Sequence, residues 1–216
     1  MTFLINAEGY DDAFYKKVYN CEKVILPSGH NQSTKNHSLL SRVLLGYILK
    51  KHYCVEKFSF IYGSNGKPYL KNEALYFNIS HSGSYIICSV AEKEIGCDVQ
   101  TTGKYNPRIA ERFFTENERA FLEKSENQPS DFTRLWALKE SVLKKTGEGI
   151  TGGLDSFCFA DCLNKNSFIK FGYHFCVSEL IGAYISVCSD EKENEITEVN
   201  IEEIENYMDT ILKGEL

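Results

Sequence analysis

The sequence has no long apolar run. None of its apolar stretches approaches the roughly 18 consecutive residues from which a transmembrane helix is recognised. The opening residues, MTFLINAEGYDD, also lack the basic start and the apolar middle of a secretory signal peptide. Nothing in the sequence therefore indicates a membrane span or export, and we expect a cytoplasmic protein.

Cysteine pairs with metal-binding spacing are scarce, although the chain has eight cysteines. Only Cys158 and Cys162 lie close together, in CFADC, and no second pair or suitable histidines accompany them. Zinc sites and disulfide frameworks need more than one such pair. The other cysteines have mostly apolar neighbours, which is typical of buried thiols. We therefore exclude a structural zinc site and a disulfide framework.

A concentrated basic region is also absent. The net charge is −6, and residues 190–206 alone carry eight acids and one lysine, so the rest of the chain is close to neutral. Nucleic-acid binding is not expected, because no basic stripe is present to contact phosphates. The acidic segment is predicted to be the solvated face of a short terminal helix. Its apolar positions are Ile201, Ile204, Tyr207, Met208 and Ile211.

The chain has 216 residues, and 43% of them are apolar. This length and composition are sufficient for a substantial core or for two small lobes. Each half combines one long helical segment, 34–53 or 131–146, with short strand-like runs. The expected strands are 2–6, 58–62, 75–80, 85–91, 95–100, 157–159, 168–171, 174–178 and 184–188. Short connections favour antiparallel pairing.

The segment RLWALKESVLKKTGEGI, residues 134–150, is predicted to be a helix that ends at Gly147 and Gly149. Glu140 and Lys144 are four residues apart and therefore share one helix face. Held together, a carboxylate and an ammonium could act on a metal, a proton and a phosphate. An isolated pair of this spacing is better explained as a solvated ion pair worth about 0.2–0.5 kcal/mol.

Two further segments place polar residues in strands. The run LYFNISHSGSYIICSVA, residues 75–91, reads as two strands joined by a turn at 81–84. In IGCDVQ, residues 95–100, Asp98 interrupts an apolar strand. A buried acid must be paired, hydrogen-bonded or bound to a metal. Taken alone, Asp98 is better explained as a structural acid than as a metal ligand.

Together, FNISHSG, then GCDVQ, then WALKES with KKTGEGI resemble the surfactin-type 4′-phosphopantetheinyl transferases, over residues 38–159. The resemblance implies an α+β fold of two similar, pseudo-symmetric lobes, each a small, mainly antiparallel sheet packed on a long helix. It implies an N-terminal lobe at 1–102, a C-terminal lobe at 103–216, and an active site at the interface between them.

The resemblance also implies a reaction. Such enzymes transfer the 4′-phosphopantetheine arm of coenzyme A to a serine of an apo acyl, peptidyl or aryl carrier protein, and release adenosine 3′,5′-bisphosphate. The metal ligands for Mg²⁺ would be Asp98, Gln100 and Glu140. Gln100 stands where the family often has a third carboxylate, and its amide adds an oxygen but no charge. Glu140 would also be the general base, and Lys144 would neutralise the pyrophosphate.

Further residues match the coenzyme A contacts of the family: Ser38, Lys67, Ser80 and His81, together with Lys144. Simpler interpretations are an exposed turn lysine for Lys67 and a first-turn helix serine for Ser38. The basic residues that would grip the 3′-phosphate match poorly, with Lys23 and Lys35 as candidates.

Three other positions carry weaker expectations. Glu118 matches a family acid near the metal, but it also completes a capping box with Thr115. Gly83 and Gly96 are assigned to tight turns.

The expected partners are coenzyme A and apo carrier proteins, without nucleic acid or membrane. A double-length chain carries both lobes itself, so we expect a monomer. Two alternatives remain open. One is a coenzyme A or carrier-protein binding module that has lost catalysis, which only Gln100 favours. The other is an α+β interaction domain whose motifs match by coincidence.

Overall fold

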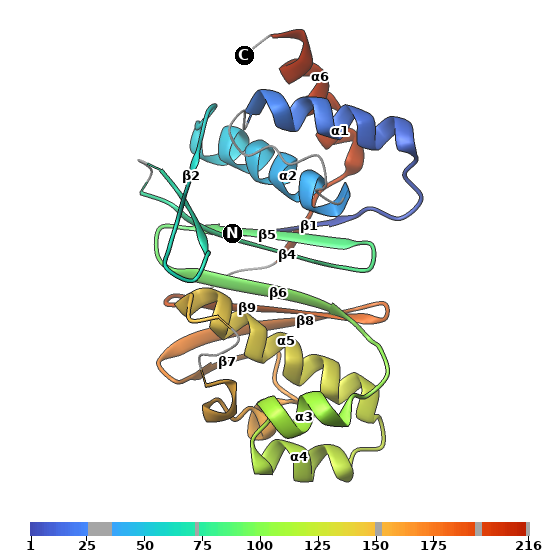
Figure 1. Cartoon of the computed structure of the whole chain (residues 1–216), viewed down its shortest axis with the longest axis vertical. Coiled ribbons are helices and arrows are strands. Elements are labelled where there is room, and N and C mark those ends of the chain that lie inside the picture. The colour runs from blue at the N-terminus through green and yellow to red at the C-terminus, as the bar shows by residue number, and fades with distance from the viewer. Residues whose placement is uncertain (26–35, 72–73, 150–152, 193–195, 215–216) are drawn as a thin grey trace.

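Two four-stranded sheets lie against each other, and each is covered on its outer side by helices (Figure 1). This computed structural model describes residues 1–25, 36–71, 74–149, 153–192 and 196–214. The predicted α+β class is confirmed. None of the described helices has the length and apolar character needed to cross a membrane.

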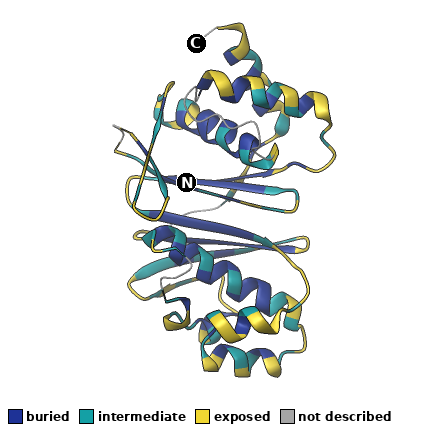
Figure 2. Cartoon of the chain, in the orientation of Figure 1, coloured by how far each residue is buried: buried dark blue, intermediate teal, exposed yellow. Residues whose placement is uncertain are grey.

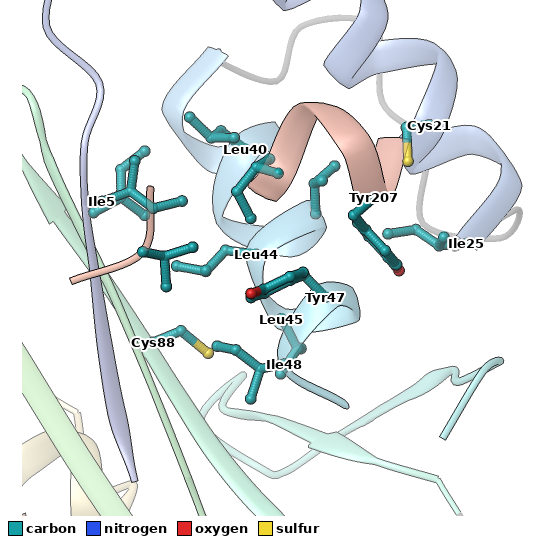
Figure 3. Packing of buried hydrophobic residues seen from close by; sticks show 14 of the residues in the cluster. Ile5, Cys21, Ile25, Leu40, Leu44, Leu45, Tyr47, Ile48, Cys88 and Tyr207 are labelled. Atoms are coloured by element: carbon teal, nitrogen blue, oxygen red, sulfur yellow. The ribbon is translucent and has the colours of Figure 1, made fainter. Parts of the chain in front are cut away.

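The first lobe is built on the sheet with strand order β10-β1-β5-β4. Its elements are β1 (Thr2–Asn6), α1 (Asp12–Ile25), α2 (Asn36–Tyr53), β2 (Phe60–Tyr62), β3 (Pro68–Leu70), β4 (Tyr76–Ser82), β5 (Tyr85–Ala91), β10 (Ile196–Glu198) and α6 (Ile201–Lys213). Strands β2 and β3 form a separate antiparallel hairpin. Helix α2 packs Leu44 and Ile48 toward Ile5 and Cys88 of the sheet (Figure 3).

The second lobe is built on the sheet with strand order β6-β9-β8-β7. Its elements are β6 (Ile95–Thr101), α3 (Pro107–Phe113), α4 (Glu116–Glu123), α5 (Gln128–Thr146), β7 (Ser167–Lys170), β8 (Tyr173–Leu180) and β9 (Ala183–Ser189). The strand expected at 157–159 is wrong, because this stretch lies between two 3₁₀ turns, Leu154–Ser156 and Ala160–Cys162.

The two lobes share one connectivity. In each, a first strand is followed by a long helix and then by an antiparallel hairpin, and the second hairpin strand pairs with the first strand. The series is β1, α2, β4, β5 in the first lobe and β6, α5, β8, β9 in the second. Both first-strand pairings, β1 with β5 and β6 with β9, are antiparallel. This repeat of topology is the pseudo-symmetry that the resemblance implies.

The division of the chain differs from the expected 1–102 and 103–216. Strand β6 belongs to the second sheet, so the second lobe begins near Ile95. The chain then returns, because β10 pairs in parallel with β1 and α6 packs on the core of the first lobe. The physical reason is burial: Ile204 and Met208 of α6 are completely buried there.

Buried residues are concentrated between the layers (Figure 2). One cluster fills the first lobe between its sheet and helices α1, α2 and α6, and a second fills the space beneath α5. A third cluster joins the facing sides of the two sheets, with Leu4 and Ile87 from the first and Cys97, Val99 and Ile185 from the second. Each Å² of apolar surface buried there stabilises the folded state by about 25 cal/mol. Because the third cluster buries apolar surface of both sheets, the two lobes form one packed body.

Candidate active site

Side chains of the edge strand β4 bind the backbone of the edge strand β6. The nitrogen-to-oxygen distances are 2.8 Å from Cys97 N to Asn78 Oδ1, 3.4 Å from Val99 N to Ser80 Oγ, and 3.0 Å from Thr101 N to Ser82 Oγ. These N–H groups point away from β9 and would otherwise lack partners, which is costly for buried backbone. The polar face of β4 therefore fixes β6, and Asp98 with it, against the first lobe.

Helix α5 approaches the other face of β6 at Gly96. A Cβ atom at this glycine would lie 2.1 Å from the carbonyl oxygen of Ser141 and 2.3 Å from the amide nitrogen of Lys145. No side chain fits in that space. The expectation that Gly96 serves a tight turn is wrong, because Gly96 lies within β6 and its role is to admit the helix backbone.

Asp98 is the centre of a hydrogen-bonded cluster between the lobes. Its Oδ1 accepts hydrogen bonds from Ser80 Oγ at 2.7 Å and from Lys144 Nζ, which also forms an ion pair with it. Lys144 Nζ further donates to Ser80 Oγ at 2.8 Å, and Gln100 Nε2 donates to Asp98 Oδ2 at 2.8 Å. Only 1% of the Asp98 side chain is exposed. Residues from β4, β6 and α5 thus converge on one buried carboxylate.

Glu140 lies one turn before Lys144 on α5. Burial raises the pKa of the Glu140 carboxyl above its ordinary value, the negative charge of Asp98 raises it further, and Lys144 partly opposes both. No hydrogen bond or ion pair joins this carboxylate to another residue in the described part of the chain. Among the described residues, only the charge of Lys144 therefore offsets its ionised form, and only in part, which suits a base or a metal ligand.

Lys144 is held in its charged form. Burial lowers the pKa of this ammonium, but the charge of Asp98 and the hydrogen bond to it outweigh that effect, so the pKa lies above its ordinary value. A lysine that stays charged can neutralise a phosphate as a compact point charge.

The two carboxylates fit Mg²⁺. No three acidic, histidine or cysteine side chains converge in the residues that the structure describes. Mg²⁺ nevertheless often takes only one or two protein carboxylates, with substrate phosphates and waters as its other ligands. A divalent cation would also relieve the repulsion by which Asp98 raises the pKa of Glu140. Gln100 acts here as a hydrogen-bond donor to Asp98, so its part in holding a metal would be to orient that ligand.

Ser38 and His81 meet at the edge of a surface hollow. Ser38 Oγ lies 3.2 Å from His81 Nε2. The hollow has a volume of about 540 Å³ and is lined by Asn36, His37, His81 and Gly83. The ring of His37, which the sequence did not single out, has its centroid 6.2 Å from that of His81. Ser38 lies in the first turn of α2 and His81 is the residue before the last of β4, so two elements of the first lobe meet at this hollow.

Lys67 lies at the end of α5, away from that hollow's lining. Its Nζ forms an ion pair with Glu94 at 2.5 Å and donates to the carbonyl of Lys145 at 2.8 Å. The interpretation of Lys67 as a plain exposed turn lysine is wrong, because only 8% of its side chain is exposed to solvent. Lys35 is outside the described residues, and Lys23 sits over the Tyr19 ring at 4.6 Å.

Glu118 and Lys139 form a fully buried ion pair at 2.8 Å. The predicted capping box is confirmed, since Glu118 accepts from the backbone of Thr115 while the Thr115 hydroxyl accepts from that of Glu118. Glu118 also accepts from the Phe159 amide at 2.9 Å. It therefore joins α4 to α5 and the following loop.

Asn78 is a residue that the sequence reasoning missed, although it lies in the quoted motif FNISHSG. A signal was present, because Asn78, Ser80 and Ser82 alternate along one strand face. Three polar residues on one face of an otherwise apolar strand indicate a polar contact surface.

Comparison with known proteins gives consistent matches. Residues 94–188 match the family model of the 4′-phosphopantetheinyl transferase superfamily. The chain is 36% identical to the 4′-phosphopantetheinyl transferase psf-1 of Bacillus pumilus over 125 residues, which are 56% of this chain and 54% of psf-1. It is 33% identical to the 4′-phosphopantetheinyl transferase Sfp of Bacillus subtilis, over 59% of each chain. The chain thus spans little more than half the length of these relatives.

A third relative is matched over more of its length. The 4′-phosphopantetheinyl transferase AcpT of Escherichia coli K12 is 31% identical over 140 residues, which are 61% of this chain and 70% of AcpT. A solved structure of holo-[acyl-carrier-protein] synthase from Thermotoga maritima aligns with a TM-score of 0.30 and 20% identity, over 46% of this chain and 64% of that one.

Proposed function

Since the chain belongs to the 4′-phosphopantetheinyl transferase superfamily, we propose that it transfers the 4′-phosphopantetheine arm of coenzyme A to a serine of an apo carrier protein. The observation that carries the proposal is the cluster in which Ser80, Asp98 and Lys144 converge beside Glu140. It supplies a base, a buried carboxylate and a fixed cation together.

The reaction would be attack by the carrier serine on the phosphorus that bears the pantetheine arm. A bond forms between the serine oxygen and that phosphorus, and the phosphoanhydride bond to the adenosine half breaks. The serine proton passes to Glu140, directly or through a water, and adenosine 3′,5′-bisphosphate leaves with the bond electrons. The raised pKa of Glu140 favours this role, because a base whose pKa lies closer to neutral accepts a proton more readily.

Lys144 would stabilise the leaving group, because its ammonium stays charged and can contact the pyrophosphate oxygens. Asp98 and Glu140 would hold Mg²⁺, with Gln100 orienting Asp98. When bound, Mg²⁺ supplies positive charge that offsets the negative charge of the pyrophosphate. The Ser80 hydroxyl, which is hydrogen-bonded to both Asp98 and Lys144, would hold these two side chains in place.

Coenzyme A would enter at the hollow beside Ser38 and His81. Both side chains can donate hydrogen bonds to phosphate oxygens. The second substrate would be an apo acyl, peptidyl or aryl carrier domain. We further propose that the protein acts in the cytoplasm as a monomer, since one chain carries both lobes.

The test is the mass of an apo carrier protein after incubation with the protein, coenzyme A and Mg²⁺. Wild type should add one phosphopantetheine group, and Glu140→Ala should not. Glu148→Ala is the matched control, because Glu148 is an exposed acid just beyond the end of the same helix. Omission of Mg²⁺ should abolish the gain in mass.

Failure has two distinguishable forms. If no carrier gains mass but calorimetry detects coenzyme A binding, the protein is a binding module that has lost catalysis. If neither transfer nor binding is detected, the proposed function is wrong.

A further inference from the structure

The β2–β3 hairpin of the first lobe reaches the C-terminal end of α5 in the second. Asn65 Nδ2 donates a hydrogen bond to the carbonyl of Gly147 at 2.9 Å, and Lys67 Nζ donates to the carbonyl of Lys145 at 2.8 Å. The last four carbonyls of a helix have no partner within the helix. Lys67 therefore satisfies one of these carbonyls, and Asn65 satisfies the carbonyl of the residue that caps the helix.

Lys67 is held firmly in this position. Its Nζ also pairs with Glu94 at 2.5 Å, in the connection between β5 and β6, and lies 5.3 Å from the centre of the Tyr69 ring. A cation is favoured at a helix C-terminus, where the helix dipole places partial negative charge. Electrostatics and packing thus agree on the placement of this ammonium.

The helix end is shaped to receive the hairpin. Gly147 ends α5 in the left-handed conformation with φ of 72°. A Cβ atom at Gly147 would lie 3.3 Å from Lys67 Cδ and 3.5 Å from the Tyr69 hydroxyl. A larger residue would press against the lysine stem, so the glycine permits both the backbone turn and the contact.

We infer that Asn65 and Lys67 are positioning residues: they hold the last turn of α5 so that Lys144 stays against Asp98 and Ser80. This inference rests on the proposed function and assigns Lys67 to helix capping, where the family resemblance implies a contact with coenzyme A. Without the two bonds, the last helical turn would fray. Lys144 would then lose its fixed place, whereas the hollow at Ser38 and His81 would be unchanged.

The test compares Lys67→Met, Lys67→Arg and Asn65→Ala with wild type. Methionine keeps an apolar stem over Tyr69 but removes the charge and the donors. We expect Lys67→Met to lower kcat by about 10–100-fold, on the scale of a small misplacement of a catalytic group, with KM for coenzyme A unchanged. Lys67→Arg should recover part of kcat, because guanidinium keeps the charge and can donate to both partners. Asn65→Ala should lower kcat less.

A second readout does not depend on turnover. Amide hydrogen exchange in residues 143–149 should be faster in Lys67→Met than in wild type. Lys71→Met is the matched control, because Lys71 is an exposed lysine at the end of the same hairpin. It should change neither kcat nor exchange.

Two results would overturn the inference. If Lys67→Met raises KM for coenzyme A and leaves amide exchange unchanged, Lys67 is a coenzyme A ligand. If it changes neither kcat nor amide exchange, the hairpin has no positioning role. If wild type proves inactive, the exchange comparison still decides whether the hairpin holds the helix end, so failure of the proposed function is seen separately.

Discussion

At the residue scale, the pair Glu140 and Lys144 was predictable because helical spacing depends only on the local chain. Their shared neighbour was not. Asp98 is 42 residues before Glu140 in the sequence, and only the packing of β6 under α5 brings Lys144 onto its carboxylate. The family motifs identified the three residues together, whereas the hydrogen bonds from Ser80 and Gln100 to Asp98 became visible only in the fold.

Glu140 should lower the stability of the folded protein at neutral pH. Its pKa is raised in the folded state by burial and by Asp98, so its ionised form is disfavoured there relative to the unfolded chain. The stabilising contribution of the protonated form is present below the unfolded pKa and is lost as pH rises through the folded pKa. Glu140→Gln, which cannot ionise, should therefore raise Tm at pH 7, and the gain should vanish below about pH 4.

The measurement is thermal unfolding of wild type and Glu140→Gln across that pH range, with the exposed Glu111→Gln as control. The control should leave Tm unchanged at every pH. Phosphopantetheine transfer by Glu140→Gln should fall by at least about 100-fold, the scale of general base catalysis. A lower Tm at pH 7 would show that Glu140 stabilises the fold and that the sign of its pKa shift is opposite.

At the element scale, the sequence predicted structures whose causes are local. The capping box at Thr115 is local, and so is the helix expected at 34–53, and both are confirmed, the helix as α2. The error at Gly96 has a different cause. Whether a glycine serves a turn or a close backbone approach depends on which element packs against it, and that element, α5, lies more than 30 residues later in the sequence.

Gly96→Ala should separate α5 from β6. The added methyl would meet backbone atoms of Ser141 and Lys145, which cannot rotate away as a side chain can. We expect the free energy of unfolding to fall by about 1–3 kcal/mol, the cost of overpacking a core, and transfer activity to fall more steeply than stability. Chemical denaturation and the carrier mass assay measure the two effects.

The matched control is Gly103→Ala. A Cβ atom at Gly103 would have no neighbour within 4 Å. This variant should keep wild-type stability and activity. If Gly96→Ala behaved in the same way, the close contact between α5 and β6 would not be what holds Lys144 to Asp98.

At the scale of the whole molecule, the path of the chain could not be read from its pattern. The apolar positions of α6 correctly predicted an amphipathic helix, and four of the five are buried: Ile204, Tyr207, Met208 and Ile211. An amphipathic pattern predicts that one face of a helix packs on a hydrophobic core, but it does not identify which core. Here α6 covers the core of the first lobe. The chain therefore begins in the first lobe, forms the second lobe, and returns to the first with β10 and α6.

This return makes the C-terminal helix part of the first lobe, and Ile204→Ala tests it. Ile204 is completely buried, whereas Leu212 on the same helix is 41% exposed and serves as the control. Ile204→Ala should lower the free energy of unfolding by about 2–5 kcal/mol, and Leu212→Ala far less. Amide exchange locates the effect: it should rise in α1 and α2, against which α6 packs, before it rises in β8 and β9. Faster exchange confined to β8 and β9 would instead assign the helix to the second lobe, as a division at residue 102 requires.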